Sequence, residues 1–205
     1  VDEMDHVNDL IRFVDTVADA GCKVFIIHAR KAWLSGLSPR ENREIPPLQY
    51  HRVYALKERY PEFTIVINGG ITRIDQAAAH LERVDGVMVG REAYQNPWSL
   101  IEVDHVLFGD TPTYPSRLDV LEAYKTYMRD ELEKGVPLKR LARHLLGLFQ
   151  GEPGARTWRR ALSEAAFRSG ADLTAIEAAQ NSLDTTRREH AAASAVSNQG
   201  MGLRL

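Results

Sequence analysis

Cysteine is almost absent from this chain of 205 residues, since Cys22 is the only one. A single cysteine excludes an internal disulfide and favours a reducing compartment. Apolar runs of about 18 residues, the length needed to span a bilayer, are also missing, and the N-terminal residues do not resemble a signal peptide. We therefore expect a cytoplasmic protein that does not enter the membrane.

A strong charge of one sign is lacking as well. The net charge is −2, which excludes a uniformly basic protein that coats nucleic acid. The charge is unevenly distributed, however: residues 1–20 are acidic, whereas residues 30–59 and 117–160 each carry a net charge of +4. An anionic partner would bind at these two basic stretches.

The first half of the chain alternates helical patterns with short apolar runs. Strands are expected at 22–27, 64–67 and 86–89, and helices at 7–18, at about 48–59, after a capping-box-like start at Thr72 and Asp75, and from Asn96 and Pro97. This order predicts parallel strands with right-handed crossovers. Because three strands cannot close a barrel, we expect an α/β fold that forms the C-terminal part of a longer TIM (β/α)8 barrel, with about three βα units.

The second half is purely helical in pattern. Helices are expected from Ser116, from Pro137, near 155–168 and near 173–183, which together predict a small helical bundle. From residue 184 the composition loses its periodicity, and a disordered tail is expected. The predicted domains are a partial barrel over 1–110, a helical domain over 116–183 and a tail over 184–205.

Two of the predicted strands end at glycine. The second runs into Asn68, Gly69 and Gly70, and the third runs into Gly90 and Arg91. Glycine lets backbone N–H groups approach an anion closely, and a guanidinium at the start of the next helix favours a phosphate. The alternative is that both are ordinary tight turns. Two such loops on neighbouring strands predict a phosphate-binding cup.

His28 follows the first strand and is therefore expected at the same edge of the sheet, where an imidazole could donate to a planar cofactor. A purely structural histidine is the alternative. Cys22 lies at the opposite end of this strand, so we interpret it as a small core thiol rather than a nucleophile.

Two pairs of arginines have the same spacing. Arg40 and Arg43 lie in a polar loop, and Arg156 and Arg159 lie on a predicted helix, where residues three apart share a face and Arg160 is expected to point elsewhere. Such arginines can contact successive RNA phosphates. A merely solvated basic surface is the alternative.

Four segments carry a resemblance to a known family: 25–43, 67–71, 89–98 and 154–162. Through them the chain resembles the tRNA-dihydrouridine synthases, in particular the bacterial subfamily that acts on the D-loop at positions 20/20a, over residues 1 to about 180. The first and last segments are the most specific, because the glycine loops alone would fit many flavin barrels.

The resemblance implies an FMN enzyme that uses NADPH as reductant and binds the D-loop of tRNA. It also implies that the enzyme needs no metal and is a monomer at full length. Hydride would pass from the flavin to C6 of a flipped uracil, and a cysteine would protonate C5. By position, the cofactor-binding residues would be His28, Asn68, Gly69, Gly70, Gly90 and Arg91. The tRNA-binding residues would be Arg40, Arg43, Arg156 and Arg159.

The family's catalytic cysteine and a flavin-contacting lysine are expected upstream of Val1. No catalytic residue is therefore assigned in this chain, and we expect the chain alone to be inactive and to bind FMN weakly at most. Two alternatives remain at this point: another FMN barrel oxidoreductase that acts on a small molecule, and a non-catalytic remnant that binds tRNA.

Overall fold

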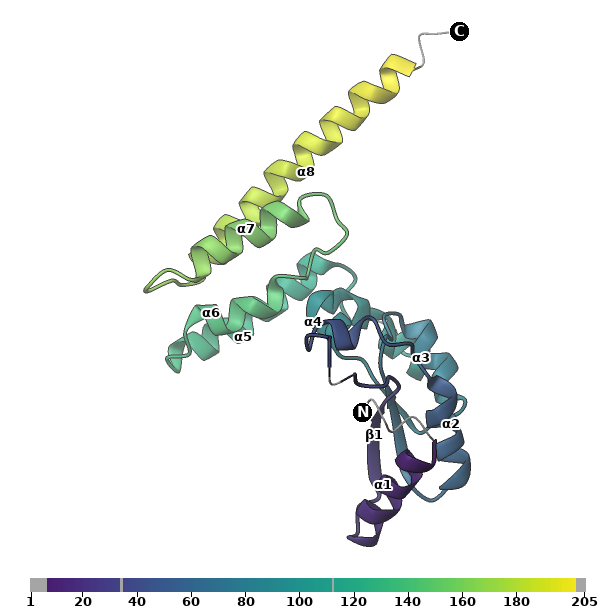
Figure 1. Cartoon of the computed structure of the whole chain (residues 1–205). Coiled ribbons are helices and arrows are strands. Elements are labelled where there is room, and N and C mark those ends of the chain that lie inside the picture. Colours follow the sequence, from purple (N-terminus) through teal and green to yellow (C-terminus); the bar gives the residue numbers. More distant parts are fainter. Residues whose placement is uncertain (1–6, 34, 112, 202–205) are drawn as a thin grey trace. The chain divides into compact units, whose positions relative to one another are not determined.

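The computed structural model describes residues 7–33, 35–111 and 113–201 (Figure 1). Residues 1–6 of the predicted first domain and 202–205 of the predicted tail lie outside this part. The chain divides into two compact units. The first extends through Glu92 and includes Glu102–Asp110, and the second contains Ala93–Ile101 and the chain from Thr111 onward. Residues 93–101, which the sequence analysis placed with the barrel, thus belong to the helical unit.

The first unit is an α/β structure around a three-stranded parallel sheet. Strands β1 (Val24–His28), β2 (Thr64–Asn68) and β3 (Gly86–Met88) lie in the order β1-β2-β3. The register pairs His28 with Asn68, and Asn68 with Met88. The three strand ends therefore meet at one edge of the sheet, as the sequence predicted.

Helices α1 (Val7–Asp19), α2 (Tyr50–Arg59) and α3 (Ile74–Leu81) supply the apolar side chains that cover one face of this sheet (Figure 1). Alternate strand residues point to opposite faces, so Phe25, Ile65 and Ile67 are buried in this core. The other face stays open: Val24 and Ile26 are about 60% exposed. His28 and Asn68 belong to this open face, because they follow the same alternation.

Helix α3 differs from its prediction in its first turn. The side chain that closes the cap is Gln76, whose Oε1 accepts hydrogen bonds from the N–H groups of Thr72 and Arg73 at 3.1 and 3.2 Å. Asp75 instead pairs with Arg73. The helix thus begins one residue later than a cap at Thr72 implied. The chain continues through α4 (Arg91–Gln95), the 3-10 helix η2 (Pro97–Glu102) and a π-helical turn, η3 (Asp104–Phe108).

The second unit contains α5 (Arg117–Glu133), α6 (Leu138–Ala142), the 3-10 turn η4 (Arg143–Leu145), α7 (Ala155–Ala166) and α8 (Thr174–Met201). Ser116 caps α5 by accepting the N–H of Asp119. The core of the unit is formed by Phe149 and Trp158, which stack edge to face at 4.9 Å, and by Leu121, Leu162 and Ile176, all fully buried. Helices α7 and α8 lie side by side (Figure 1).

The helical content departs from the prediction at two places. The helix expected from Pro137 breaks up after α6, where Gly147 approaches Gln95 so closely that a Cβ would overlap the Gln95 carbonyl. Helix α8 continues to Met201, through the segment in which a disordered tail was expected. Residues 184–199 contain no glycine or proline and many alanines, so helix propensity sustains the helix without an apolar stripe.

Candidate cofactor and RNA sites

A hydrogen-bonded row of groups crosses the carboxyl edge of the sheet. Asn68 donates through Nδ2 to the Met88 carbonyl at 2.8 Å, and its Oδ1 lies 2.6 Å from Nδ1 of His28. Since Asn68 uses its NH2 group toward Met88, its oxygen is the acceptor, and Nδ1 of His28 carries the proton. The neutral His28 ring therefore offers Nε2 as an acceptor, and Nε2 becomes a donor only in the imidazolium form.

Gly69 and Gly70 adopt backbone angles that disfavour other residues. Their φ values are 120° and 68°, in the region that glycine alone enters without strain. A Cβ at Gly70 would also lie 2.5 Å from Cδ1 of Leu48. Tyr50 stabilises this turn, because its hydroxyl donates a hydrogen bond to the Gly69 carbonyl at 2.7 Å. Burial raises the pKa of Tyr50, which keeps this hydroxyl protonated.

Gly90 is different, because its backbone is unstrained and the space beside it is open. A Cβ there would meet only Nδ2 of Asn68, at 4.0 Å. Among the described residues, the N–H groups of Gly69, Gly70 and Gly90 have no hydrogen-bond acceptor in the protein. These donors follow the ends of β2 and β3, two neighbouring strands of the sheet. Backbone N–H groups without protein acceptors are the groups with which proteins bind anions.

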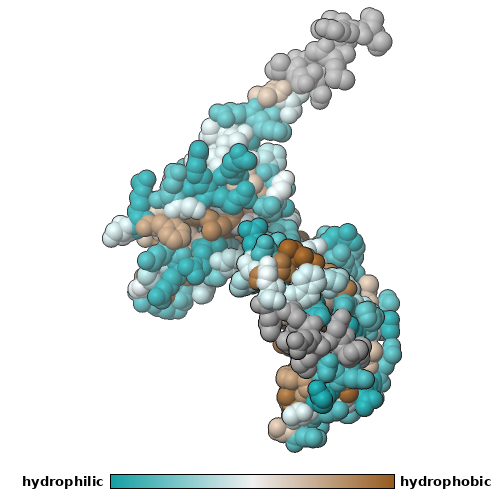
Figure 2. Space-filling model, viewed as in Figure 1, coloured by the Kyte–Doolittle hydropathy of each residue, from teal (hydrophilic) through white to brown (hydrophobic). Residues whose placement is uncertain are grey.

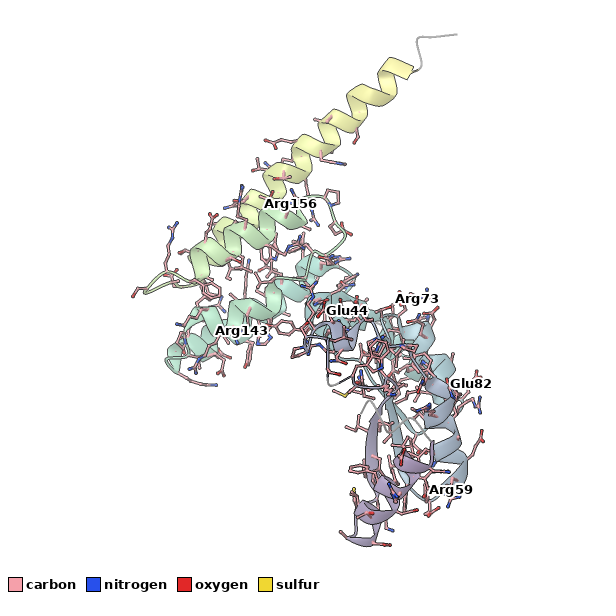
Figure 3. All side chains as sticks on the ribbon, in the orientation of Figure 1. Glu44, Arg59, Arg73, Glu82, Arg143 and Arg156 are labelled. Carbon is pink, nitrogen blue, oxygen red and sulfur yellow. The ribbon has the colours of Figure 1, made fainter. Side chains whose placement is uncertain are left out.

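Arg91 points toward the long loop that follows β1. Its Nη1 lies 2.9 Å from Oε1 of Glu44, and its Nη2 donates to the Arg43 carbonyl at 3.0 Å. Arg40 reaches the same carboxylate at 3.8 Å. Arg91 and Arg40 therefore both lie near the carboxylate of Glu44, which is labelled in Figure 3.

The loop itself is ordered by internal contacts. Asn42 exchanges two hydrogen bonds with the backbone of Trp33, both at 2.7 Å. The side chains of Ser38 and Glu41 each accept the backbone N–H of the other, at the start of the 3-10 turn η1 (Glu41–Arg43). Ser38 lowers the pKa of Glu41 through these hydrogen bonds. Arg30 donates to the Glu44 carbonyl at 2.9 Å. The first predicted arginine pair thus lies on a defined surface.

The second arginine pair is divided by its environment. On α7, Arg156 is exposed and labelled in Figure 3, whereas Arg159 is half-buried and donates to Oε1 of Gln150 at 2.6 Å. Arg160 is exposed, and as a residue four positions from Arg156 it shares that side of the helix. The expectation that Arg160 points away from Arg156 is therefore corrected.

Cys22 lies before β1, at the end of the strand opposite to His28, and its Sγ contacts the Val24 carbonyl at 3.3 Å. Sequence reasoning missed Glu44, Asn42 and Tyr50 as parts of the site. A Ser-x-x-Glu capping pattern at Ser38 was the one available signal that this loop is ordered.

The family model for dihydrouridine synthase (Dus) matches residues 1–185. The chain belongs to the dihydrouridine synthase family. This is a family of oxidoreductases that act on tRNA and have a TIM-barrel fold.

Three similar proteins are each named tRNA-dihydrouridine(20/20a) synthase. The protein of Shewanella oneidensis is 56% identical over 185 residues, which cover 90% of this chain and 55% of the relative. The Escherichia coli O6:H1 protein is 54% identical over 178 residues, which cover 86% of this chain and 54% of that protein. The Salmonella typhimurium protein is 54% identical over 180 residues, which cover 87% of this chain and 54% of that protein. The chain spans about half the length of the curated relatives it matches.

No helix within the described residues combines the length and apolarity needed to cross a membrane. In the same part of the chain, no group of three or more His, Cys, Asp or Glu side chains is placed to hold a metal ion.

Proposed function

We propose that this chain supplies the FMN phosphate site and the tRNA-binding surface of an enzyme that forms 5,6-dihydrouridine at positions 20/20a of the tRNA D-loop, with NADPH as reductant. The names of the relatives support the reaction. The observation that carries the cofactor part is the convergence of three strand ends, where Gly69, Gly70 and Gly90 present N–H groups without protein acceptors.

These residues fit the phosphate end of FMN. A side chain at position 90 would project into the open space beside Gly90, and Arg91 at the start of α4 supplies a guanidinium that suits phosphate oxygens. His28 presents Nε2 to the open face of the sheet, where it would contact the flavin ring. The bound flavin would supply the hydride that the uracil accepts.

The tRNA side of the proposal uses the two basic surfaces. Arg40 and Arg43 lie in the ordered loop beside the phosphate site, and Arg156 and Arg159 lie on α7. Arginines of this kind hold the RNA backbone and leave a flipped uridine free to meet the flavin. The remaining strands of the barrel would cover the exposed side chains of Val24 and Ile26.

A chimaera tests this proposal. The matching segment of the Shewanella oneidensis relative is replaced by residues 1–185 of this chain, and dihydrouridine in unmodified tRNA is measured by mass spectrometry after incubation with FMN and NADPH. We expect product at positions 20/20a, and we expect none from the 205-residue chain alone. A folded chimaera that binds tRNA and forms no product would instead support the non-catalytic remnant.

A further inference from the structure

A cavity of about 490 Å³ opens in the helical unit, between the turn that joins α5 to α6 and the loop that follows α7. Its floor is apolar, because Leu132, Pro137, Leu138 and Ala166 line it, and two of these, Leu138 and Ala166, are 2% exposed. The same lining includes residues 167–171 and Lys139. The cavity therefore combines a hydrophobic floor with a polar and basic rim.

The rim carries one aromatic ring and two cations. Phe167 directly follows α7 and is 54% exposed. Arg168 and Lys139 are exposed, and both line the cavity. Within the described residues, neither cation forms an ion pair and Phe167 stacks on no other ring.

This rim continues the arginine surface of α7. Arg156, Arg160, Ser163 and Phe167 are all exposed and recur at steps of four, three and four residues, which places them along one side of the helix. The eleven steps from Arg156 to Phe167 span about 16 Å at a helical rise of about 1.5 Å per residue. Figure 2 shows the hydrophilic surface of this unit interrupted by a hydrophobic band.

We propose that this cavity receives one unpaired nucleotide of the bound tRNA. Its base would stack on Phe167 above the apolar floor, and its phosphate would lie between Arg168 and Lys139. Exposed aromatic rings flanked by cations are how proteins hold unpaired bases without reading a sequence. An apolar ligand would leave both cations unused, and an acidic peptide would leave the ring unused. The inference rests on the proposed function, because it needs tRNA to lie along α7.

The experiment uses the 205-residue chain and an unmodified tRNA transcript, with binding followed by fluorescence anisotropy at several salt concentrations. Phe167→Ala is expected to weaken binding about five- to tenfold with an unchanged salt dependence, since stacking releases no counterions. Arg168→Gln is expected to weaken binding and to reduce the salt slope by about one. Phe167→Trp is expected to retain the affinity of the parent chain.

Matched controls come from the same unit. Tyr127→Ala removes an equally exposed ring from α5, and Lys134→Gln removes a cation that is already paired with Glu131 at 2.8 Å. Neither is expected to change binding. Ultraviolet crosslinking gives a second readout: trypsin releases residues 161–168 as one peptide, and this peptide should carry a crosslinked nucleotide.

Different outcomes would disprove the nucleotide site and the tRNA-binding function. If Arg156→Gln weakens binding but Phe167→Ala binds tRNA as tightly as the parent chain, the nucleotide site is wrong and the proposed function stands. If Arg168→Gln alone acts, the cavity is an anion-binding surface without stacking, which also overturns the inference. If Arg156→Gln and salt have no effect on tRNA binding, the proposed RNA role itself fails.

Discussion

Arg91 and Glu44 form an ion pair, 2.9 Å between Nη1 and Oε1, that joins the end of β3 to the loop after β1. The same guanidinium donates to the carbonyl of Arg43. Sequence resemblance assigns Arg91 to a phosphate and Arg40 to tRNA, yet in the structure the Glu44 carboxylate lies near both guanidinium groups. If Arg91 binds the FMN phosphate as proposed, Glu44 would compete with that phosphate for the Arg91 guanidinium.

Glu44→Gln should consequently tighten FMN binding in the chimaera about two- to fivefold, the effect of releasing one exposed ion pair. Quenching of flavin fluorescence measures the affinity. Asp75→Asn is the matched control, because it makes the same charge change and releases Arg73, which is paired at 2.5 Å on the surface of the same unit. Equal effects of the two variants would mean that Glu44 acts only through overall charge.

Alanine at position 90 should impair FMN binding, whereas alanine at position 70 should impair the stability of the fold. Gly90→Ala is expected to leave the thermal stability of the chain unchanged, since its Cβ meets only one atom at 4.0 Å, and to weaken FMN binding in the chimaera about tenfold. Gly70→Ala is expected to destabilise the fold by about 1–3 kcal/mol, the cost of a non-glycine residue in a disfavoured backbone conformation. Thermal unfolding and flavin fluorescence separate the two effects. If Gly90→Ala binds FMN normally, the open space is not the phosphate site.

The strand ends could be predicted from sequence because each depends on local pattern. Apolar runs that stop at His28, Asn68 and Gly90 fix the edge of a parallel sheet, and glycine at 69 and 70 already indicates a positive φ. The structure confirms a three-stranded parallel sheet.

Contacts across loops could not be predicted in the same way. Glu44 lies 47 residues before Arg91, and nothing in either local pattern indicates that they meet. Arg159 is likewise directed to Gln150 by the fold of the turn before α7. The cap of α3 was predicted one residue away because Asp75 and Gln76 both suit an N-terminal turn, and only side-chain geometry decides between them.

His80 should make the stability of the chain depend on pH. It is buried in α3, where its Nδ1 lies 2.7 Å from the Tyr54 hydroxyl and its ring packs edge to face on Tyr50. Burial lowers the pKa of His80 below its ordinary value of 6.5. The unfolded chain therefore binds a proton before the folded chain does, so this contribution to stability is complete above pH 6.5 and decreases as the pH falls through the folded pKa.

Urea unfolding at pH 7.5 and at pH 5.5 measures this effect. The parent chain should lose stability between the two values, and His80→Gln should lose less, because it removes the one buried histidine found among the described residues. His51→Gln, a substitution at an exposed position on α2, is the control. It should lose as much unfolding free energy between the two pH values as the parent chain does. If His80→Gln loses as much unfolding free energy between pH 7.5 and pH 5.5 as the parent chain, the pH dependence arises from other groups.

Asp85 should stabilise the sheet at neutral pH. It precedes β3, and its Oδ2 accepts the Ile65 N–H at 2.8 Å while pairing with Lys57 at 2.9 Å. The hydrogen bond from Ile65 is the main cause that lowers the pKa of Asp85 below 3.8. The nearby Lys57 also lowers this pKa, and burial partly offsets the shift. A lowered pKa for a carboxyl group means that the stabilisation is present above about pH 4 and is lost as the pH falls through the folded pKa.

Asp85→Ala is therefore expected to cost about 1 kcal/mol at pH 7, a modest value for a hydrogen bond to a charged group because the side chain is partly exposed and screened by solvent. Asp85→Asn should cost less, since an amide oxygen can still accept the Ile65 N–H while the attraction to Lys57 is lost. Urea unfolding at pH 7 and at pH 3 separates the effect of charge from the effect of packing. The difference in unfolding free energy between the parent chain and Asp85→Ala should become smaller at pH 3. A difference that stays constant with pH would assign the loss to packing at the start of β3 rather than to the charge of Asp85.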